Sequence, residues 1–357
     1  MEVSNHEDIG SCYDEIRRKV AEWLERRDLA DADVAIDITG GTKPMSAALA
    51  LAAVERFSHF RYVGGTKRDS GDLGAVLPGA ERVLTCRNPW DKYAIREMER
   101  ARELLRNYYA DSAAETLRQA AARCDDAMRS RICALAAFVA ALTAADRFDF
   151  RTARNTYGKC RGQIEQILNW QTFTSTEQLF KHWQAVREQT KRSDKTPSRE
   201  TILELVANAD RRAAQFRFDD AVGRLYRAVE LHAQGLAREH FGAELGKVPI
   251  TSIPSHKQEA FKKEFGDSED GIYRLGVKQL FGSLEYGNVE DADESRSVYD
   301  RLEKHLRIRN NSLFAHGSVC VTESMFQEFR ESLLRELPVK DSEIPRWPEA
   351  SSVLNTT

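Results

Sequence analysis

The segment from residue 34 to residue 57 constrains the fold more than any other part of the chain. It begins with the short apolar run Val34–Ile38, continues through the successive glycines Gly40 and Gly41, and ends in an Ala- and Leu-rich stretch. A short apolar run bounded by turn residues is typical of a strand covered on both faces, as in a parallel sheet. The segment therefore predicts a strand, a tight turn and a buried helix in succession.

The flanking segments extend this pattern on both sides. Apolar residues at helical spacing predict an amphipathic helix over residues 8–27, and Phe60–Val63 predicts a second strand that ends at Gly64 and Gly65. The succession helix–strand–helix–strand is typical of a Rossmann-like α/β domain. We expect this domain to occupy residues 1–90.

The remainder of the chain is predicted to be helical. From residue 93 to about residue 183 the sequence shows helical periodicity with almost no Gly or Pro, so we expect a helical connector over residues 91–198. A second helical block is expected over residues 199–340. The Pro- and Ser-rich residues 341–357 predict a flexible tail.

Composition limits the partners and the compartment. The 357 residues are 41% hydrophobic and 31% charged, which suits two or three folded domains rather than a disordered chain. Because the net charge is only −3, any nucleic-acid site must be local. The six cysteines contain no C-x-x-C pair, and no signal peptide or membrane-spanning run is evident. We therefore expect a cytoplasmic protein that binds no metal and no membrane.

The glycine turn has the residue types of a phosphate-binding loop. Two glycines let the backbone approach a ligand closely, and exposed amides at a strand-to-helix turn attract phosphate. Thr39, Thr42 and Lys43 add hydroxyls and a charge. Neither the Walker spacing nor G-x-G-x-x-G is present, so a tight turn without a ligand explains the segment equally well.

The segment Arg309–Gly317 places an arginine and a histidine seven residues apart. On an α-helix this spacing brings Arg309 and His316 to one face, roughly 10 Å apart along the axis. A histidine can move the proton of a ribose 2′-OH or of a leaving 5′-oxygen, and an arginine can stabilise the charge on phosphorus. Asn310 can orient the phosphate or the histidine. The pair therefore predicts a site for cutting RNA.

The spacing itself is a weak signal. Chance predicts about two or three arginines followed by a histidine at this kind of distance, and Arg227 with His232 is a second match. This second pair lies in a long helical pattern, which favours a solvated or core role. The Arg309 segment is rich in polar residues and is followed by Gly317, which is typical of a helix that opens onto a cleft. A structural role for either pair stays open.

Three segments resemble known families. Residues 37–48, Asp-Ile-Thr-Gly-Gly-Thr-Lys-Pro-Met-Ser-Ala-Ala, resemble the signature of CARF domains, the CRISPR-associated Rossmann-fold sensors. Residues 309–317, Arg-Asn-Asn-Ser-Leu-Phe-Ala-His-Gly, resemble the R-N-x-x-x-x-x-H site of HEPN ribonucleases. Residues 219–230 resemble the HEPN-side helix of one CARF–HEPN family from type III CRISPR systems. The resemblance covers most of residues 10–335 and predicts an α/β Rossmann-like CARF domain, then an all-α region with a C-terminal HEPN domain.

The resemblance also implies a function. Proteins of this family are ribonucleases that cyclic oligoadenylate switches on, and they act as homodimers on single-stranded RNA. Cleavage uses the 2′-OH of the RNA, needs no metal or other cofactor, and leaves a 2′,3′-cyclic phosphate and a 5′-OH. By similarity, Arg309 and His316 are catalytic and Asn310 assists them. The effector-binding candidates by similarity are Thr39, Gly40, Gly41, Thr42, Lys43 and Met45, extended less strongly by Gly64, Gly65 and Arg68.

One departure from the family pattern concerns the sensor. CARF domains of this family have at least one strand and helix before the strand that corresponds to Val34–Ile38, so we expect a shortened sensor. Three other functions remain compatible with the sequence. They are a non-catalytic nucleotide-sensing regulator, a toxin-type HEPN ribonuclease that ignores the ligand, and a sensor that cleaves its own cyclic ligand. The sequence does not determine the ring size of the effector or the RNA sequence preference.

Overall fold

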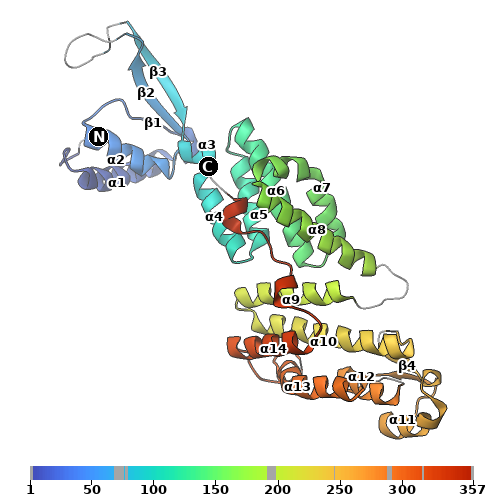
Figure 1. Ribbon diagram of the computed structural model, residues 1–357. Helices are drawn as coiled ribbons and strands as arrows, with labels where there is room; N and C mark the ends of the chain where they lie inside the picture. The colour runs from blue at the N-terminus through green and yellow to red at the C-terminus, as the bar shows by residue number, and fades with distance from the viewer. Residues whose placement is uncertain are drawn as a thin grey trace. The chain divides into compact units, whose positions relative to one another are not determined.

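The computed structural model describes residues 3–67, 76, 79–190, 198–244, 246–287, 292–315 and 317–354. The chain divides into two compact units. One comprises Met1–Ala101, Ala114–Ala136 and Leu354–Thr357, and the other comprises Arg102–Ala113 and Ala137–Val353. The four-part division expected from the sequence stays a prediction, but the expectation of a mostly helical chain after the N-terminal sheet is confirmed (Figure 1).

The N-terminal unit contains a small three-stranded sheet with two helices beside it. Its first elements are α1 (Ile9–Arg27), β1 (Ala35–Asp37), α2 (Lys43–Val54), β2 (His59–Gly65) and β3 (Glu81–Arg87). Strands β1 and β2 run parallel, and β3 pairs antiparallel with β2. The predicted helices and the first two strands are confirmed. Gly64 and Gly65 are the last two residues of β2, where they pair with Arg82 and Glu81.

Strand β3 was not predicted, and its side chains explain why. All seven of its residues are exposed, so no buried face imposes an alternating pattern. Its apolar residues, Val83 and Leu84, are neighbours in the chain and therefore point to opposite faces. The strand is held by its backbone pairing with β2, which extends beyond the short β1.

The core of this part is made by α1, α2 and the first two strands. Asp8 caps α1 by accepting a hydrogen bond from the Ser11 amide at 2.6 Å. The buried apolar side chains are Cys12, Ile16, Leu24, Ile36, Ala48, Ala53, Phe57 and Phe60. This core places the glycine turn at the end of β1, directly before α2.

A run of helices follows the sheet. They are α3 (Pro89–Tyr93), α4 (Ile95–Arg106), α5 (Ala110–Ala121), α6 (Asp126–Asp146), α7 (Phe150–Ile167) and α8 (Trp170–Thr190). Helix α6 is the one helix of the described residues that is long and apolar enough to cross a membrane by length and composition. Its side chains Leu135, Phe138, Val139 and Leu142 are completely buried, so packing within a helical core accounts for its apolar character.

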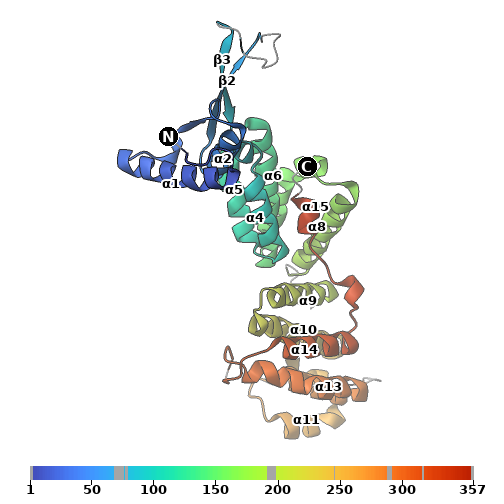
Figure 2. The same ribbon diagram turned by 90° about the vertical axis from the view of Figure 1, so that its left-hand side faces the viewer.

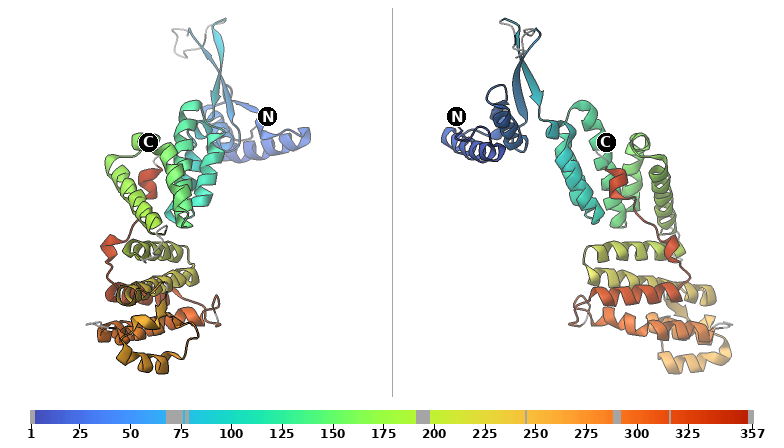
Figure 3. Two further views of the ribbon diagram at one scale, coloured as in Figure 1. Left: turned by 90° about the vertical axis from the view of Figure 1, so that its right-hand side faces the viewer. Right: turned by 60° about the vertical axis from the view of Figure 1, so that its left-hand side comes forward.

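The C-terminal helices pack in successive layers. Helix α10 (Phe218–Phe241) packs against α9 (Arg199–Ala214), α12 (Val277–Ser283), α13 (Ala292–Asn311) and α14 (Glu323–Glu336). Figures 2 and 3 show α9, α10, α14 and α13 lying side by side in this order. Along the chain between α10 and α12 lie β4 (Lys247–Pro249), α11 (Gln258–Phe265) and β5 (Ile272–Arg274), and the two strands pair antiparallel.

Residues 341–354 are packed rather than loose. Residues 341–354 were expected to lie in a flexible tail, but Ile344, Trp347, Val353 and Leu354 are buried. The Trp347 ring meets the Tyr108 ring edge-on at 5.5 Å and lies 5.1 Å from the Arg211 guanidinium carbon. The Pro and Ser content misled the prediction because a few large apolar side chains are enough to anchor an irregular segment.

Candidate functional site

The last turn of α13 carries Arg309 and Asn310. Upstream on the same helix, Leu302, His305 and Leu306 are buried and hold α13 against its neighbours. The His305 ring stacks on Phe329 with centroids 5.6 Å apart, and its Nε2 lies 2.9 Å from Ser332 Oγ. The end of α13 is therefore fixed by a packed face, while its polar side chains project where the helix stops.

Arg309 differs from the other arginines around it. Its guanidinium carbon lies 4.9 Å from the centre of the Tyr226 ring of α10, and its Nη1 donates a hydrogen bond to Asn310 Oδ1 at 3.2 Å. Within the described residues it forms no ion pair, whereas Arg307 on the same helix bonds to Glu303 at 3.0 Å. A guanidinium held over an aromatic ring without a carboxylate keeps its charge available for an anion.

The ring beneath Arg309 stays a neutral phenol. Burial, and then the carboxylate of Glu230, raise the pKa of Tyr226, while the charge of Arg309 opposes them. Glu230 forms an ion pair with Arg227 on its own helix. The partner that orients Arg309 is thus an aromatic ring rather than an acid.

The chain leaves α13 through a closed loop, residues 312–319. The Leu313 amide donates to the Val319 carbonyl at 3.1 Å, and the Val319 amide donates to the Asn311 carbonyl at 2.9 Å. The carbonyl of the buried Ser312 accepts from the amides of Ala315 at 3.0 Å and Gly317 at 3.2 Å. The loop backbone therefore returns to the end of the helix and is fixed by its own hydrogen bonds.

Gly317 is required by this closure. A Cβ built at this position would lie 2.1 Å from the Asn311 carbonyl oxygen and 2.5 Å from its carbonyl carbon. Because the clash is with backbone, no side-chain rotation can relieve it. The structure thus explains why position 317 requires glycine, which the sequence alone did not.

His316 lies outside the described residues. The expectation that positions 309 and 316 share one helix is wrong, because α13 ends at Asn311 and the next residues form turns. What the structure does fix is the backbone on both sides of this position, through the amides of Ala315 and Gly317. The roles of Arg309, Asn310 and His316 stay predictions.

The threonines of the glycine turn are occupied by their own chain. Thr39 Oγ1 accepts a hydrogen bond from the Val63 amide of β2 at 2.7 Å, and the Thr39 amide donates to Asp37 Oδ1 at 2.8 Å. Hydrogen bonding from the side chain and then from the amide of Thr39 lowers the pKa of Asp37. Thr42 caps α2 and donates its hydroxyl to the His6 carbonyl at 2.6 Å. The hydroxyls of Thr39 and Thr42 therefore stabilise the fold, in addition to any contact with a ligand.

The other residues of the turn differ in how open they are. A Cβ at Gly40 would meet nothing within 4 Å, so this backbone is open to close approach. Gly41 has φ +92°, a conformation that side chains disfavour. Lys43 is exposed at the start of α2, where a cation can meet a bound phosphate. Met45 packs against the small core of α1 and α2.

The second glycine pair serves packing. A Cβ at Gly65 would lie 2.1 Å from Val76 Cγ1, and one at Gly64 would lie 3.1 Å from the Tyr62 ring. These glycines admit the chain's own side chains close to the strand. Arg68 lies outside the described residues. The inclusion of Gly64, Gly65 and Arg68 in a ligand site stays a prediction, as does that of the turn at residues 39–45.

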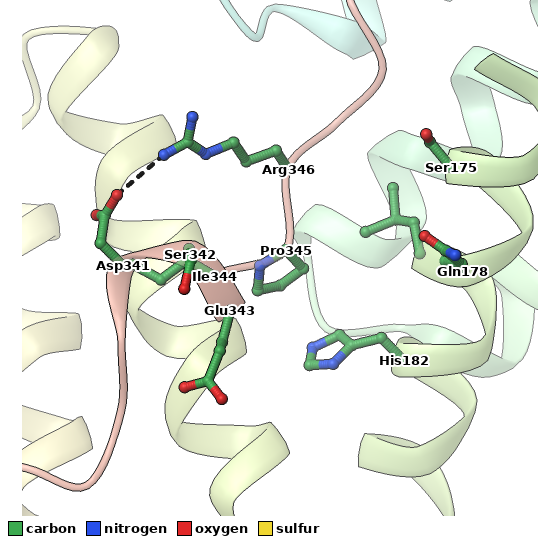
Figure 4. A pocket seen from close by; sticks show the side chains of 10 residues that line it. Ser175, Gln178, His182, Asp341, Ser342, Glu343, Ile344, Pro345 and Arg346 are labelled. Atoms are coloured by element: carbon green, nitrogen blue, oxygen red, sulfur yellow. Dashed lines mark hydrogen bonds and ion pairs between the residues drawn. The ribbon is translucent and has the colours of Figure 1, made fainter. Parts of the chain in front are cut away.

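A cavity of about 850 Å³ in the C-terminal unit was not predicted. Figure 4 shows its residues, which come from α8 and from the segment after α14: Ser175, Gln178, Leu179, His182, Asp341, Ser342, Glu343, Ile344, Pro345 and Arg346. Its charges are paired, because Asp341 accepts from Arg330 at 2.6 Å and from Arg346 at 3.1 Å, and Glu343 bonds to Arg199. Such pairing suits a packed seam better than an anion or cation site.

A buried ionic network lies next to this cavity and was also missed. Glu204 of α9 is completely buried and accepts from Arg211 at 2.6 Å and from the Trp183 indole at 2.8 Å. Arg211 also bonds to Asp146 of α6 at 2.8 Å. Burial raises the pKa of Glu204, but Arg211 and His182 together outweigh it and hold the pKa below its usual range. No local sequence pattern reveals a network spread over three helices.

Within the described ranges, no group of three or more His, Cys, Asp and Glu side chains is arranged to hold a metal ion.

Comparisons with known proteins bear on both units. Residues 190–338 match the family described as the Csm6 HEPN domain. Among solved structures, the chain is similar to Csm6 of Enterococcus italicus, which was solved bound to cyclic hexa-2′-fluoro-hexa-dAMP. That match has a TM-score of 0.58 and 13% identity, and it covers 100% of this chain and 82% of the Csm6 chain. The comparison with curated proteins gave no match.

Proposed function

We propose that this chain, a CARF–HEPN accessory protein of CRISPR systems by its Csm6 HEPN domain and its Csm6-like fold, is an endoribonuclease that cyclic oligoadenylate activates. The matched HEPN family and the fold support a ribonuclease of this kind. The observation that carries the proposal is Arg309. It lies inside the matched domain, at a helix end, over Tyr226 and without an ion-pair partner in the described part of the chain.

The proposed reaction is an internal transfer within the RNA. The 2′-oxygen attacks the neighbouring phosphorus, a new O2′–P bond forms, and the bond from phosphorus to the 5′-oxygen breaks. The proton of the 2′-OH is removed and the leaving 5′-oxygen gains one, so the products are a 2′,3′-cyclic phosphate and a 5′-OH. We assign the proton transfers to His316 and the stabilisation of the phosphorane charge to Arg309. Asn310 accepts from Arg309 and helps to orient it.

The activator is proposed for the glycine turn. The structural relative was solved with a cyclic adenylate analogue, which supports this class of ligand. In this chain, the parallel β1–β2 pair, the open Gly40 backbone and the exposed Lys43 support a small Rossmann-like CARF site at the carboxyl end of β1. The site would include Thr39, Gly41, Thr42, Met45, Gly64, Gly65 and Arg68. We further propose a homodimer that acts in the cytoplasm, as a CRISPR effector would.

Cleavage of a labelled single-stranded RNA tests the proposal. The purified chain is assayed in EDTA, with and without cyclic tetra-adenylate or hexa-adenylate, beside His316→Ala. His240→Ala is the matched control, because His240 is an exposed histidine in the last turn of α10. We expect cleavage only with a cyclic ligand, lost in His316→Ala and kept in His240→Ala.

The other outcomes identify the alternatives. Cleavage that is equal with and without ligand would favour a toxin-type HEPN ribonuclease. Ligand binding without cleavage would favour a non-catalytic regulator. Loss of the added ligand over time, without RNA cleavage, would favour a sensor that cuts its own activator.

A further inference from the structure

The loop after α13 exposes two large apolar side chains. Phe314 is 84% exposed and Leu313 is 62% exposed. Single exposed apolar residues are common on protein surfaces and need no explanation. Here, however, two neighbours stand out together, in the loop that follows the candidate arginine.

The backbone that carries these side chains is not free to fold them away. Leu313 is tied to Val319 through its amide, and Ala315, directly after Phe314, is tied to Ser312. The close approach of Gly317 to the Asn311 backbone closes the base of the loop. A loop fixed on both sides of Phe314 holds the ring in the solvent, although burying it would be favourable.

The chemistry around the ring suits a polyanion that carries flat apolar groups. No Asp or Glu occurs between Arg309 and Thr322. The Cα atom of Phe314 lies within about 11 Å of that of Asn311, since three extended residues span no more. The exposed ring belongs to the residue five positions after Arg309, whose guanidinium has no carboxylate partner among the described residues.

We propose that Phe314 and Leu313 form a platform on which an unpaired RNA base stacks beside the phosphate held by Arg309. This inference rests on the proposed function and deepens it. Stacking needs a base that is splayed from its neighbours, so the substrate class is RNA with unpaired bases rather than a duplex. Because every base has a π-face, the platform tolerates different bases.

A second copy of the chain is a weaker candidate for the occupant. Stable interfaces bury about 800 Å² on each partner. A phenylalanine and a leucine cover a fraction of that area, and the charge beside them is of one sign. The observations therefore favour RNA, and self-association through this loop becomes an outcome of the test.

Three variants examine the platform by RNA cleavage and by RNA binding in fluorescence anisotropy. We expect Phe314→Ala to lower kcat/KM for single-stranded RNA roughly tenfold and to weaken binding by a similar factor. Phe314→Trp keeps a stacking surface and should keep both values. Phe216→Ala is the matched control, because Phe216 is 79% exposed in the turn between α9 and α10 and should change neither value.

An RNA with one abasic position next to the cut separates stacking from other effects. The wild type should lose the same factor on this RNA as Phe314→Ala loses on intact RNA, and the two losses should not add. An equal loss for Phe314→Ala on both RNAs would overturn the proposal. So would a change in the mass of Phe314→Ala in analytical ultracentrifugation, which would assign the ring to an interface between copies.

The two proposals fail in different ways. Phe314-dependent binding without any cleavage would remove the nuclease and keep the platform. Cleavage and binding that ignore both Phe314 and the abasic position would keep the nuclease and remove the platform.

Discussion

Two arginine–histidine pairs lie in the same helical domain, and the surroundings of their side chains differ. Arg227 forms an ion pair with Glu230, and burial of the ring lowers the pKa of His232 to about 4. Arg309 lies over an aromatic ring at a helix end, in a segment that continues into a closed, exposed loop towards position 316. The sequence spacing of the two pairs is similar, but only Arg309 has no ion-pair partner in the part of the chain that the structure describes.

The difference teaches how a site is recognised. A charged group in an ion pair, or a titratable ring that is buried and neutral, already has a structural role and is not available to bind a ligand. A group that is held in place yet left without a partner in the described structure is available for a ligand. If this is correct, the functional pair is the one whose arginine is available for a ligand, and the sequence separation of arginine and histidine is not decisive.

The largest effect is expected at Arg309. Arg309→Ala should lower kcat for RNA about 10²–10³-fold, as the loss of one preorganised charge donor does in other enzymes. Arg307→Ala and Arg227→Ala, which remove arginines paired with Glu303 and Glu230, should keep most of the activity. Single-turnover cleavage measures all three, and equal losses in the three variants would contradict the comparison.

The next effect concerns the contribution of His232 to stability. Because the pKa of folded His232 is depressed from 6.5 to about 4, the unfolded chain binds more protons between these values. The contribution of neutral His232 to the free energy of unfolding is fully present above pH 6.5. It is lost as the pH falls toward 4, by about 3 kcal/mol in total. Urea unfolding at several pH values should show this loss in the wild type and a smaller one in His232→Leu. An identical pH dependence would refute the assignment of His232 to the core.

A backbone change should then separate loop closure from charge. In Gly317→Ala the new Cβ collides with the Asn311 backbone, so the loop must shift by an ångström or more. A shift of that size near the reacting groups should cost about 100-fold in kcat, with unchanged circular dichroism. Gly235→Ala in α10, where a Cβ meets nothing within 4 Å, should keep activity and stabilise the helix. Full activity in Gly317→Ala would show that the loop geometry is unimportant.

The smallest effect is expected at the ring beneath the arginine. Tyr226→Leu removes the aromatic face and should lower kcat roughly tenfold with little change in KM, whereas Tyr226→Phe should restore the rate. Tyr299→Leu is the control, since Tyr299 is a half-buried tyrosine of the same domain that packs near Phe281. If Tyr226→Phe were as impaired as Tyr226→Leu, the hydroxyl rather than the ring would be the important group.

Several elements could be predicted because their signals are local. The apolar run before the glycines predicted β1, and the Ala- and Leu-rich stretch predicted α2. The segment Arg309–Gly317 was singled out by residue type and polarity. Strand β3 was missed because only its pairing with β2 holds it, and the packed residues 341–354 were missed because their partners are distant in the chain.

By itself, the sequence determined the order of a small α/β part and a long helical part, and it marked the two segments with unusual chemistry. Periodicity and turn residues act over a few positions, so they are visible in a single chain. The tertiary structure decided which groups remain available. It placed Tyr226 under Arg309, occupied the hydroxyls of Thr39 and Thr42, and closed the loop at Gly317. Those outcomes depend on contacts between residues far apart in the chain, and no local pattern encodes them.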